Sequence, residues 1–226
     1  MVLKPYHRSS PYLEFKLLFM SRSISDAIIP LPIFLNTMAA SWEIKAGKCR
    51  AILQNSLNTA WLLPPNELPP AAQLNVSTFI DNCNRLSPKE LEITNSDGTQ
   101  LTHHMQTGSL TAVETVTAFL KRAHIAHQLV NFATEFMIEE ALATATELDE
   151  YFKTTGKLKG PLHGIPISIK EHIGLKGRIT HSGFVAWIDH IPSEDALIIR
   201  LLKEAGAVFH VRTNEPQSVM VSHTLV

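Results

Sequence analysis

The sequence has no excess of charge of either sign. Its 226 residues include 20 lysines and arginines against 21 acidic residues, which leaves a formal net charge of −1 with histidine neutral. A chain that binds nucleic acid or an anionic membrane surface through its overall field needs a clear positive excess. We therefore expect neither nucleic acid nor a membrane as a partner.

Cysteines and long apolar runs are also scarce. The only two cysteines, Cys49 and Cys83, form no C-x-x-C pair and no framework of spacings. A disulfide scaffold is thereby excluded, and we expect a reduced, cytoplasmic chain. The longest apolar run near the N-terminus, residues 27–35, contains two prolines. It is far shorter than the ~20 apolar residues that a membrane-spanning helix needs.

Glycine is scarce in an uneven way. The chain has 10 glycines, which is below the ~7% of average usage. Seven of the ten lie between Gly156 and Gly206. A site that depends on glycine is therefore expected in that part of the chain.

The sequence does have the hydrophobic content of a globular chain, 45% against 18% charged residues. Residues 1–37 are poorly patterned, and their basic residues and serines only faintly suggest a transit peptide because Glu14 and Asp26 argue against one. We predict that residues 1–37 are a leader outside the fold. Residues 38–226 are predicted to form the folded part.

Helical periodicity is clear in four places. An N-terminal helical arm is predicted from Ser41, and its apolar positions are Trp42, Cys49, Ile52, Leu53 and Leu57. The prolines of residues 61–70 then favour an extended segment laid over another surface. Capping boxes at Ser87–Glu90 and Thr111–Glu114 predict two helix starts, and a further helix is predicted over residues 138–155, before Gly156.

The region after Gly160 predicts a strand–helix–strand unit. The first strand is residues 165–169 and the second is residues 207–211. Between them, Ser193 is the expected N-cap of a helix that ends at Gly206, and its inward residues are expected to be Leu197, Leu201, Leu202 and Ala205. Such a unit places helices against a sheet, so the predicted fold class is α/β.

Lys170 is the candidate catalytic residue because it follows a nearly continuous apolar strand. Ligands in open α/β sheets bind at the carboxyl ends of strands. A lysine that loses solvation there becomes a neutral base at physiological pH. From the residues alone, the alternative that Lys170 reaches water or pairs with Glu171 is stronger.

The segment around Lys170 resembles a known family. Residues 160–171, Gly-Pro-Leu-His-Gly-Ile-Pro-Ile-Ser-Ile-Lys-Glu, look like the part of the amidase signature family that carries its catalytic lysine. Residues 87–94, 108–112 and 130–132 resemble the helical entry of that family. Further matches, to its fungal acetamidase-like branch, are residues 183–187, 194–197, 205–209 and 212–217.

The resemblance implies a mixed sheet flanked by helices and a hydrolase of carbon–nitrogen bonds in small amides. In that family a serine attacks the amide carbonyl, and a second serine, before a cis peptide bond, relays the proton to the lysine. Both serines lie in a Gly-Gly-Ser-Ser-Gly-Gly-like segment that the 226 residues do not contain. We therefore expect a truncated amidase domain with little activity, without cofactor or metal. Nothing in the family makes Ser168, which shares a strand face with Lys170, a nucleophile.

Other residues leave alternatives open. His163, His172, His181 and His190 recur every nine residues, which would suit a metal-binding histidine protein only if they converged in space. His124 and His127 are expected to be a solvated pair on a helix surface. Phe184 and Trp187 either shape a substrate pocket or fill core. A non-catalytic protein that acts by association is the main alternative to an amidase, and the oligomeric state stays open.

Overall fold

The protein is described by a computed structural model that defines the backbone of residues 31–220 and the side chains of residues 42–220. The chain divides into two units, residues 1–40 and 41–226, and the description below concerns the second. Most of the predicted leader, residues 1–30, lies outside the described residues. So do residues 221–226.

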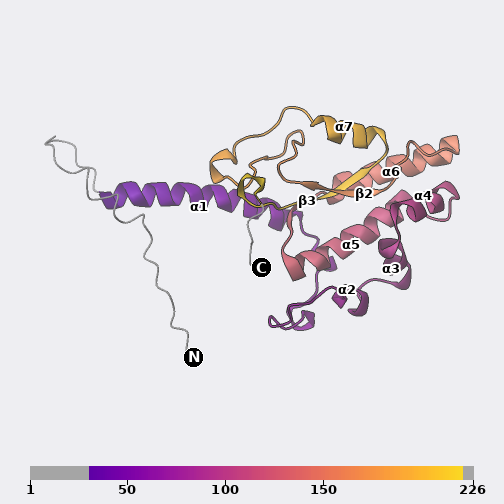
Figure 1. The fold of residues 1–226 in the computed structure, drawn as a ribbon, viewed down its shortest axis with the longest axis horizontal. Helices are drawn as coiled ribbons and strands as arrows, with labels where there is room; N and C mark the ends of the chain where they lie inside the picture. The colour runs from indigo at the N-terminus through magenta and orange to yellow at the C-terminus, as the bar shows by residue number, and fades with distance from the viewer. Residues whose placement is uncertain (1–30, 221–226) are drawn as a thin grey trace, which may run out of the picture. The chain divides into compact units, whose positions relative to one another are not determined.

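The second unit alternates helices with a few short strands (Figure 1). The described helices are α1 (Leu31–Ser56), which belongs to this unit from Ser41 on, α2 (Phe79–Asn82), α3 (Pro88–Asn95), α4 (Gly98–Gln106), α5 (Ala112–Val130), α6 (Ile138–Thr155) and α7 (Leu197–Glu204). The strands are β1 (Ala133–Phe136), β2 (Pro166–Lys170) and β3 (Val208–Thr213). Short 3-10 helices cover Thr59–Trp61, Pro65–Glu67, Val185–Trp187 and Gln217–Val219.

The three strands form one mixed sheet in the order β1-β3-β2. β2 runs parallel to β3, and α7 lies in the crossover between them, as the strand–helix–strand pattern predicts. β1 pairs antiparallel with β3. β1 was not predicted, because four residues between two helices without a glycine or proline boundary give no strand signal.

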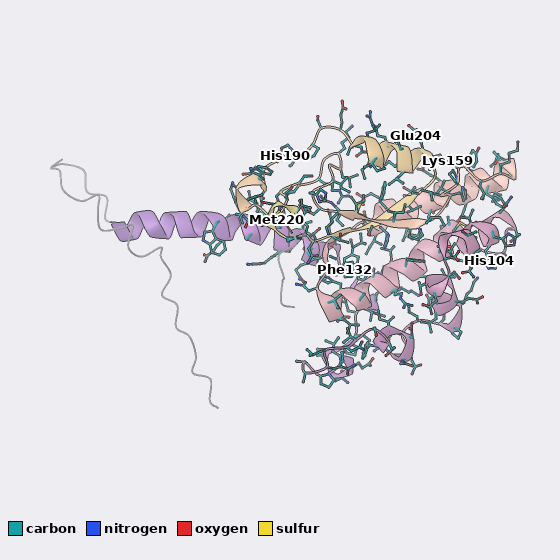
Figure 2. All side chains as sticks on the ribbon, viewed as in Figure 1. His104, Phe132, Lys159, His190, Glu204 and Met220 are labelled. Atoms are coloured by element: carbon teal, nitrogen blue, oxygen red, sulfur yellow. The ribbon has the colours of Figure 1, made fainter. Side chains whose placement is uncertain are left out.

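Helices pack on both faces of the sheet (Figure 1). Val208 and Val211 of β3 join residues of α5 and α6 in the largest core, which includes Val116, Leu120 and Leu148. On the other face, Ile169 and Phe209 pack against Ile199 of α7 and Leu175. Side chains fill the space between these elements (Figure 2). The mixed sheet flanked by helices, expected from the resemblance, is therefore present.

Both predicted capping boxes are present, and each lies at the start of a helix. Ser87 accepts from the Glu90 N–H at the start of α3, and Thr111 accepts from the Glu114 N–H at the start of α5. A third box, Asp97 with Gln100, starts α4, a helix that was not predicted. These boxes work locally because each satisfies backbone N–H groups that have no partner inside the helix.

The proline-rich segment lies over α5 as expected. Gln128 of α5 holds it by accepting from the Leu63 N–H at 2.7 Å and donating to the Leu63 carbonyl at 2.9 Å. Leu63 is buried with Leu86 and Ile125 in a separate small core. Two 3-10 turns, at residues 59–61 and 65–67, interrupt the extended backbone.

Two helix predictions are wrong at the N-terminal end. α1 begins at Leu31 rather than at Ser41; Pro32 falls in its first turn, where a missing N–H costs nothing. α7 begins at Leu197 with Ala196 as its cap, not with Ser193. The carboxylate of Asp195 instead accepts from the Lys176 N–H at 2.8 Å and from Lys203 Nζ at 2.6 Å. Those contacts tie Asp195, just before α7, to the loop at Lys176 and to Lys203 within α7 itself.

The residues predicted to face inward on α7 are also partly wrong. Ile199 is buried at 1% exposure, whereas Leu197 and Leu201 are 63% and 50% exposed. Leu202 does pack against the core beneath α7. Within the described residues, no helix combines the length and apolarity that crossing a membrane requires.

Candidate functional site

Lys170 is the last residue of β2, at the carboxyl end of the strand. Its backbone is fixed by the parallel register, in which Lys170 pairs with Thr213 and Ile169 pairs with Arg212. Because side chains alternate along a strand, Lys170 and Arg212 leave the sheet on opposite faces. The structure thus places Lys170 at the strand end, where ligands of α/β folds bind.

The Lys170 side chain is exposed, and so is that of Ser168 two residues earlier. The sequence predicted a lysine surrounded by apolar side chains, but the nearest of these, Ile169, points away from Lys170 into the core beneath α7. Ser168 and Lys170 share a face as predicted, yet no hydrogen bond joins them in the described part of the chain. The loss of solvation expected for Lys170 is therefore absent in this chain.

The turn after Lys170 is held by backbone and side-chain bonds. The Glu171 N–H donates to the Thr213 carbonyl at 2.9 Å, and the Ile173 N–H donates to the Lys170 carbonyl at 3.0 Å. Arg212 Nη2 donates to the carbonyls of Glu171 and Ile179, both at 2.8 Å. The position of Lys170 is thus fixed by an arginine on the neighbouring strand.

Glu171 does not pair with Lys170, which was the alternative raised by the sequence. Its buried carboxylate accepts from the His181 N–H at 2.7 Å and from the Ser182 N–H at 3.0 Å. It also lies 3.9 Å from Arg212 Nη2. Glu171 therefore ties the strand end to the loop around residue 181, and the Lys170 amine has no hydrogen-bond or ion-pair partner among the side chains of residues 42–220.

Arg212 and Glu171 were not identified as site residues from the sequence. Arg212 is 3% exposed, and burial lowers the pKa of its guanidinium, while the nearby Glu171 carboxylate acts in the opposite direction. A signal was available: an arginine inside the apolar run of β3 needs a buried partner. The partner could not be chosen without knowing the strand pairing.

The backbone is strained where two loops meet beside this turn. Ser182 and Ser218 have positive φ values of 50° and 60°, and the Ser218 N–H donates to the Ser182 carbonyl at 3.0 Å. Gly183 lies so close to Gln217 that a Cβ atom at this position would sit 2.7 Å from the Gln217 Cα. Strain of this kind concentrates at functional sites, which makes this junction a candidate part of the site.

Three of the four histidines spaced nine residues apart have separate partners for their side chains. His163 is buried and accepts from the Lys159 N–H at 3.0 Å, and burial lowers its pKa. His172 pairs with Glu215, and His181 lies 3.7 Å from the Glu171 carboxylate. Between residues 42 and 220, no group of three potential metal ligands comes together.

His124 and His127 are buried, which corrects the expectation of a solvated pair. His124 is 0% exposed, with Nδ1 2.7 Å from the Leu120 carbonyl and Nε2 accepting from the Asn58 N–H at 3.1 Å. His127 Nδ1 accepts from the Ala133 N–H at 3.1 Å. Burial lowers the pKa of both rings. They are structural because the segments before and after α5 cover this end of the helix.

Phe184 and Trp187 pack on each other with ring centroids 5.1 Å apart. Trp187 is 55% exposed, so it fills no core in the described structure. Of the two alternatives, a role in a substrate pocket is the one that remains open for Trp187.

Comparisons with known proteins show what the chain as a whole is similar to. Residues 114–225 match the family model described as Amidase. The chain is 41% identical to an acetamidase of Aspergillus oryzae over 83% of its length and 40% identical to an acetamidase of Emericella nidulans over 83%. Its fold is similar to that of a fatty acid amide hydrolase, with a TM-score of 0.75 at 39% identity over 79% of this chain and 32% of that one. The chain spans 34% of the length of each of the two acetamidases.

Proposed function

Because the chain belongs to the amidase family, we propose that it supplies Lys170 as the general base of a hydrolase that cleaves carbon–nitrogen bonds in small amides. The observation that carries the proposal is the position of Lys170. It lies at the carboxyl end of β2 with an exposed side chain, on a backbone that Arg212 and Thr213 hold in place.

The proposed chemistry needs groups outside these 226 residues. A serine hydroxyl attacks the amide carbonyl, and its proton passes through a second serine to Lys170 Nζ. The leaving nitrogen takes that proton back from Lys170 Nζ through the second serine as the tetrahedral intermediate collapses, so ammonia departs and an acyl-enzyme remains. Water then attacks the acyl-enzyme and releases the carboxylic acid. The printed sequence contains no Gly/Ser-rich segment that could carry these two serines.

The exposure of Lys170 adds a second requirement. A lysine amine acts as a general base only in its neutral form, which loss of solvation favours. Sequence that carries the serines must therefore also cover Lys170 and reduce its solvation. A single covering segment could meet both requirements.

The proposed substrate is a small, acetamide-like amide. The names of the two fungal relatives support this choice. The likeness to a fatty acid amide hydrolase supports the reaction type, while its name indicates a larger acyl group for that protein.

A chimera tests the proposal. Residues 38–220 are joined to the part of the Aspergillus oryzae acetamidase that follows its matched region, and ammonia release from acetamide is measured. We expect activity in the chimera and none in the 226-residue chain. Lys170→Ala should abolish the activity of the chimera, and Lys176→Ala, at another exposed lysine of the same turn region, should retain it.

An active chimera that keeps its activity with Lys170→Ala would contradict the role of the lysine. Activity of the 226-residue chain that depends on Lys170 would contradict the need for further serines. A folded chimera without activity towards acetamide, propionamide or benzamide would contradict the substrate class.

A further inference from the structure

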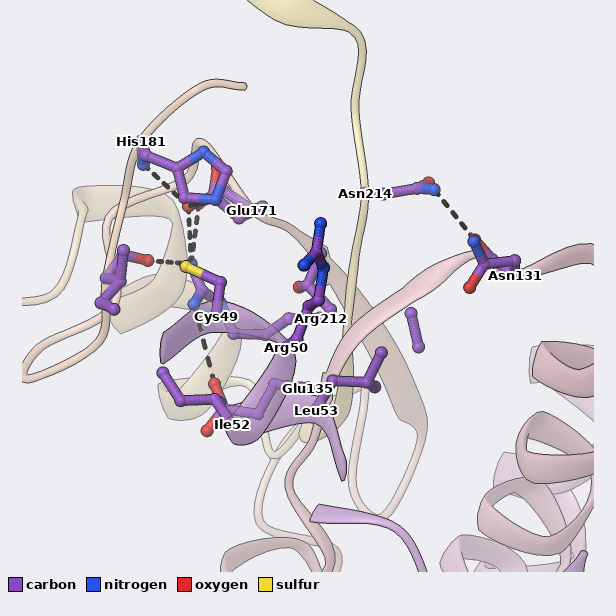
Figure 3. A pocket seen from close by; sticks show the side chains of 13 residues that line it. Cys49, Arg50, Ile52, Leu53, Asn131, Glu135, Glu171, His181, Arg212 and Asn214 are labelled. Carbon is purple, nitrogen blue, oxygen red and sulfur yellow. Dashed lines mark hydrogen bonds and ion pairs between the residues drawn. The ribbon is translucent and has the colours of Figure 1, made fainter. Parts of the chain in front are cut away.

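The two outer edges of the sheet differ in what covers them. At the β1 edge, the Phe136 N–H points away from β3 and donates to Ser56 Oγ, at the end of α1, at 3.0 Å. Leu53 of α1 packs against the core beside β1. A cavity of about 310 Å³ between α1 and the sheet is lined by Leu53, Glu135 and Arg212 (Figure 3). The β1 edge is therefore covered by α1.

The other edge is β2, and part of its backbone faces away from the sheet. At the two ends of its ladder, the Ile165 carbonyl accepts from β3 and the Glu171 N–H donates to β3, both at 2.9 Å. Alternate residues of a strand turn their backbone groups to opposite sides, so those of Pro166, Ser168 and Lys170 face outward. The side chains of Ser168 and Lys170 are exposed as well.

These outward backbone groups are self-complementary. If β2 pairs antiparallel with β2 of a second copy, centred on Ser168, each Ser168 N–H donates to the Ser168 carbonyl of the other copy. Each Lys170 N–H then donates to the Pro166 carbonyl of the other copy. Pro166 has no N–H for the Lys170 carbonyl opposite, but that carbonyl already accepts from the Ile173 N–H at 3.0 Å. The missing donor thus meets the acceptor that is already used.

The flank of α7 on the side of this edge is apolar and exposed. Leu197, Ile198 and Leu201 share that flank and are 63%, 50% and 50% exposed. Lys203, on the opposite flank, lines a cavity of about 460 Å³ together with Leu148 of α6, a helix that packs beside β1 and β3. The apolar flank therefore turns away from α6 and towards β2, as a right-handed crossover from β2 to β3 requires. Exposed apolar side chains that are grouped in this way are typical of a protein–protein contact.

We propose that two copies of the chain form a two-fold dimer through β2 and α7. The two β2 strands pair antiparallel and continue the sheet across the axis. The apolar flanks of the two α7 helices meet on the same side of the joined sheet. A surface that complements itself leads to a closed two-fold dimer. The inference concerns the 226-residue chain and does not require that this chain hydrolyses amides.

Sedimentation equilibrium of the 226-residue chain at several concentrations tests the proposal. We expect a reversible equilibrium between monomer and dimer with a micromolar dissociation constant. Ser168→Pro should raise that constant roughly tenfold or more, because both hydrogen bonds between the two Ser168 residues are lost. The monomer keeps its sheet, since the Ser168 N–H faces away from β3. Ser168→Ala keeps the N–H and is the matched control, which should dimerise like the parent chain.

The α7 contact is tested in the same way. Leu201→Glu should also raise the dissociation constant roughly tenfold or more, because the dimer would bury a carboxylate among apolar side chains. The position is half-exposed in the monomer, so the fold should tolerate the change. Leu74→Glu, at a 95% exposed position outside the sheet and α7, is the control and should leave the dissociation constant unchanged.

Disulfide formation tests the register. Directly opposed residues of a hydrogen-bonded antiparallel pair have Cα atoms about 5.5 Å apart, which suits a disulfide. Ser168→Cys should therefore link two chains on mild oxidation. Lys170→Cys should not, because the two copies of position 170 are separated by about 13 Å along the strands. The parent chain, with Cys49 and Cys83 alone, is the control for other linkages.

The proposal is overturned if the parent chain is a monomer at millimolar concentration or if Ser168→Pro dimerises as well as Ser168→Ala. It is also overturned if Lys170→Cys links as readily as Ser168→Cys. Should Ser168→Pro fail to fold, Leu201→Glu and the linkage of Ser168→Cys still decide the outcome.

Discussion

The helices α5 and α7 flank the same sheet and both carry apolar residues, but nine of the 19 residues of α5 are buried against one of the eight of α7. α5 has nine buried residues, and its start is held by Asp149 of α6, whose carboxylate accepts from the N–H groups of Ala112 and Val113 at 2.7 and 3.1 Å. In α7 only Ile199 is buried. An amphipathic pattern therefore shows which residues are apolar, but the partners present in space decide which of them are buried.

The largest effect should come from removing a leucine on α5. Leu120 is 0% exposed, so Leu120→Ala should lower the free energy of unfolding by about 3 kcal/mol because it leaves a cavity in the core. Leu201→Ala on α7, at a half-exposed position, should cost less than about 1 kcal/mol. Urea denaturation of both variants measures the difference. Equal losses would show that the two layers are equally packed.

Substitution of Glu171 tests the hydrogen bonds that join the end of β2 to the loop at His181 and Ser182. Glu171→Gln keeps the shape but leaves one of the N–H groups of His181 and Ser182 without an acceptor, which should cost about 2 kcal/mol. Hydrogen exchange at these two amides should become faster by a larger factor than exchange within α5. Unchanged protection of both amides would contradict the role given to this carboxylate.

His210 should make stability depend on pH. Burial lowers its pKa to about 4, while its Nδ1 lies 3.2 Å from the Ile167 carbonyl and its ring meets Phe119 of α5. The unfolded chain takes up the proton near pH 6.5 and the folded chain does not, so stability is lost as the pH falls from about 6.5 towards 4. The contribution should be about 2 kcal/mol at pH 5 relative to pH 7.5.

His210→Phe removes this titration and should reduce the pH dependence of urea unfolding by that amount. His103→Asn, at an exposed position on α4, is the control and should leave the pH dependence unchanged. A parent-like pH dependence in His210→Phe would place the titration on other buried histidines.

The smallest effect on stability is expected at Lys170. Its side chain is exposed and pairs with no carboxylate in the described residues, so Lys170→Ala should leave the urea midpoint unchanged. The same substitution should abolish activity in the chimera. A large loss of stability would instead mark Lys170 as a structural residue.

The sequence predicted much of the fold and only part of the candidate site. Capping boxes at Ser87 and Thr111, the strand that starts at Pro166 and the crossover to β3 are all read from short stretches, and each is present. Lys170 was identified from a continuous stretch of sequence, because it directly follows the apolar strand residues and lies in the segment that resembles the amidase signature family. Glu171 and Arg212, 41 residues apart, were not paired because their contact depends on the register of β2 with β3.

By itself, the sequence determined the local elements, the position of Lys170 at a strand end and the family. These depend on periodicity, caps and short motifs, whose physical causes lie within a few residues. Only the tertiary structure decided that His124 and His127 are buried, that Leu197 and Leu201 are exposed, and that Lys170 remains solvated. Burial depends on which distant segments pack against a side chain, and that packing is a property of the whole fold.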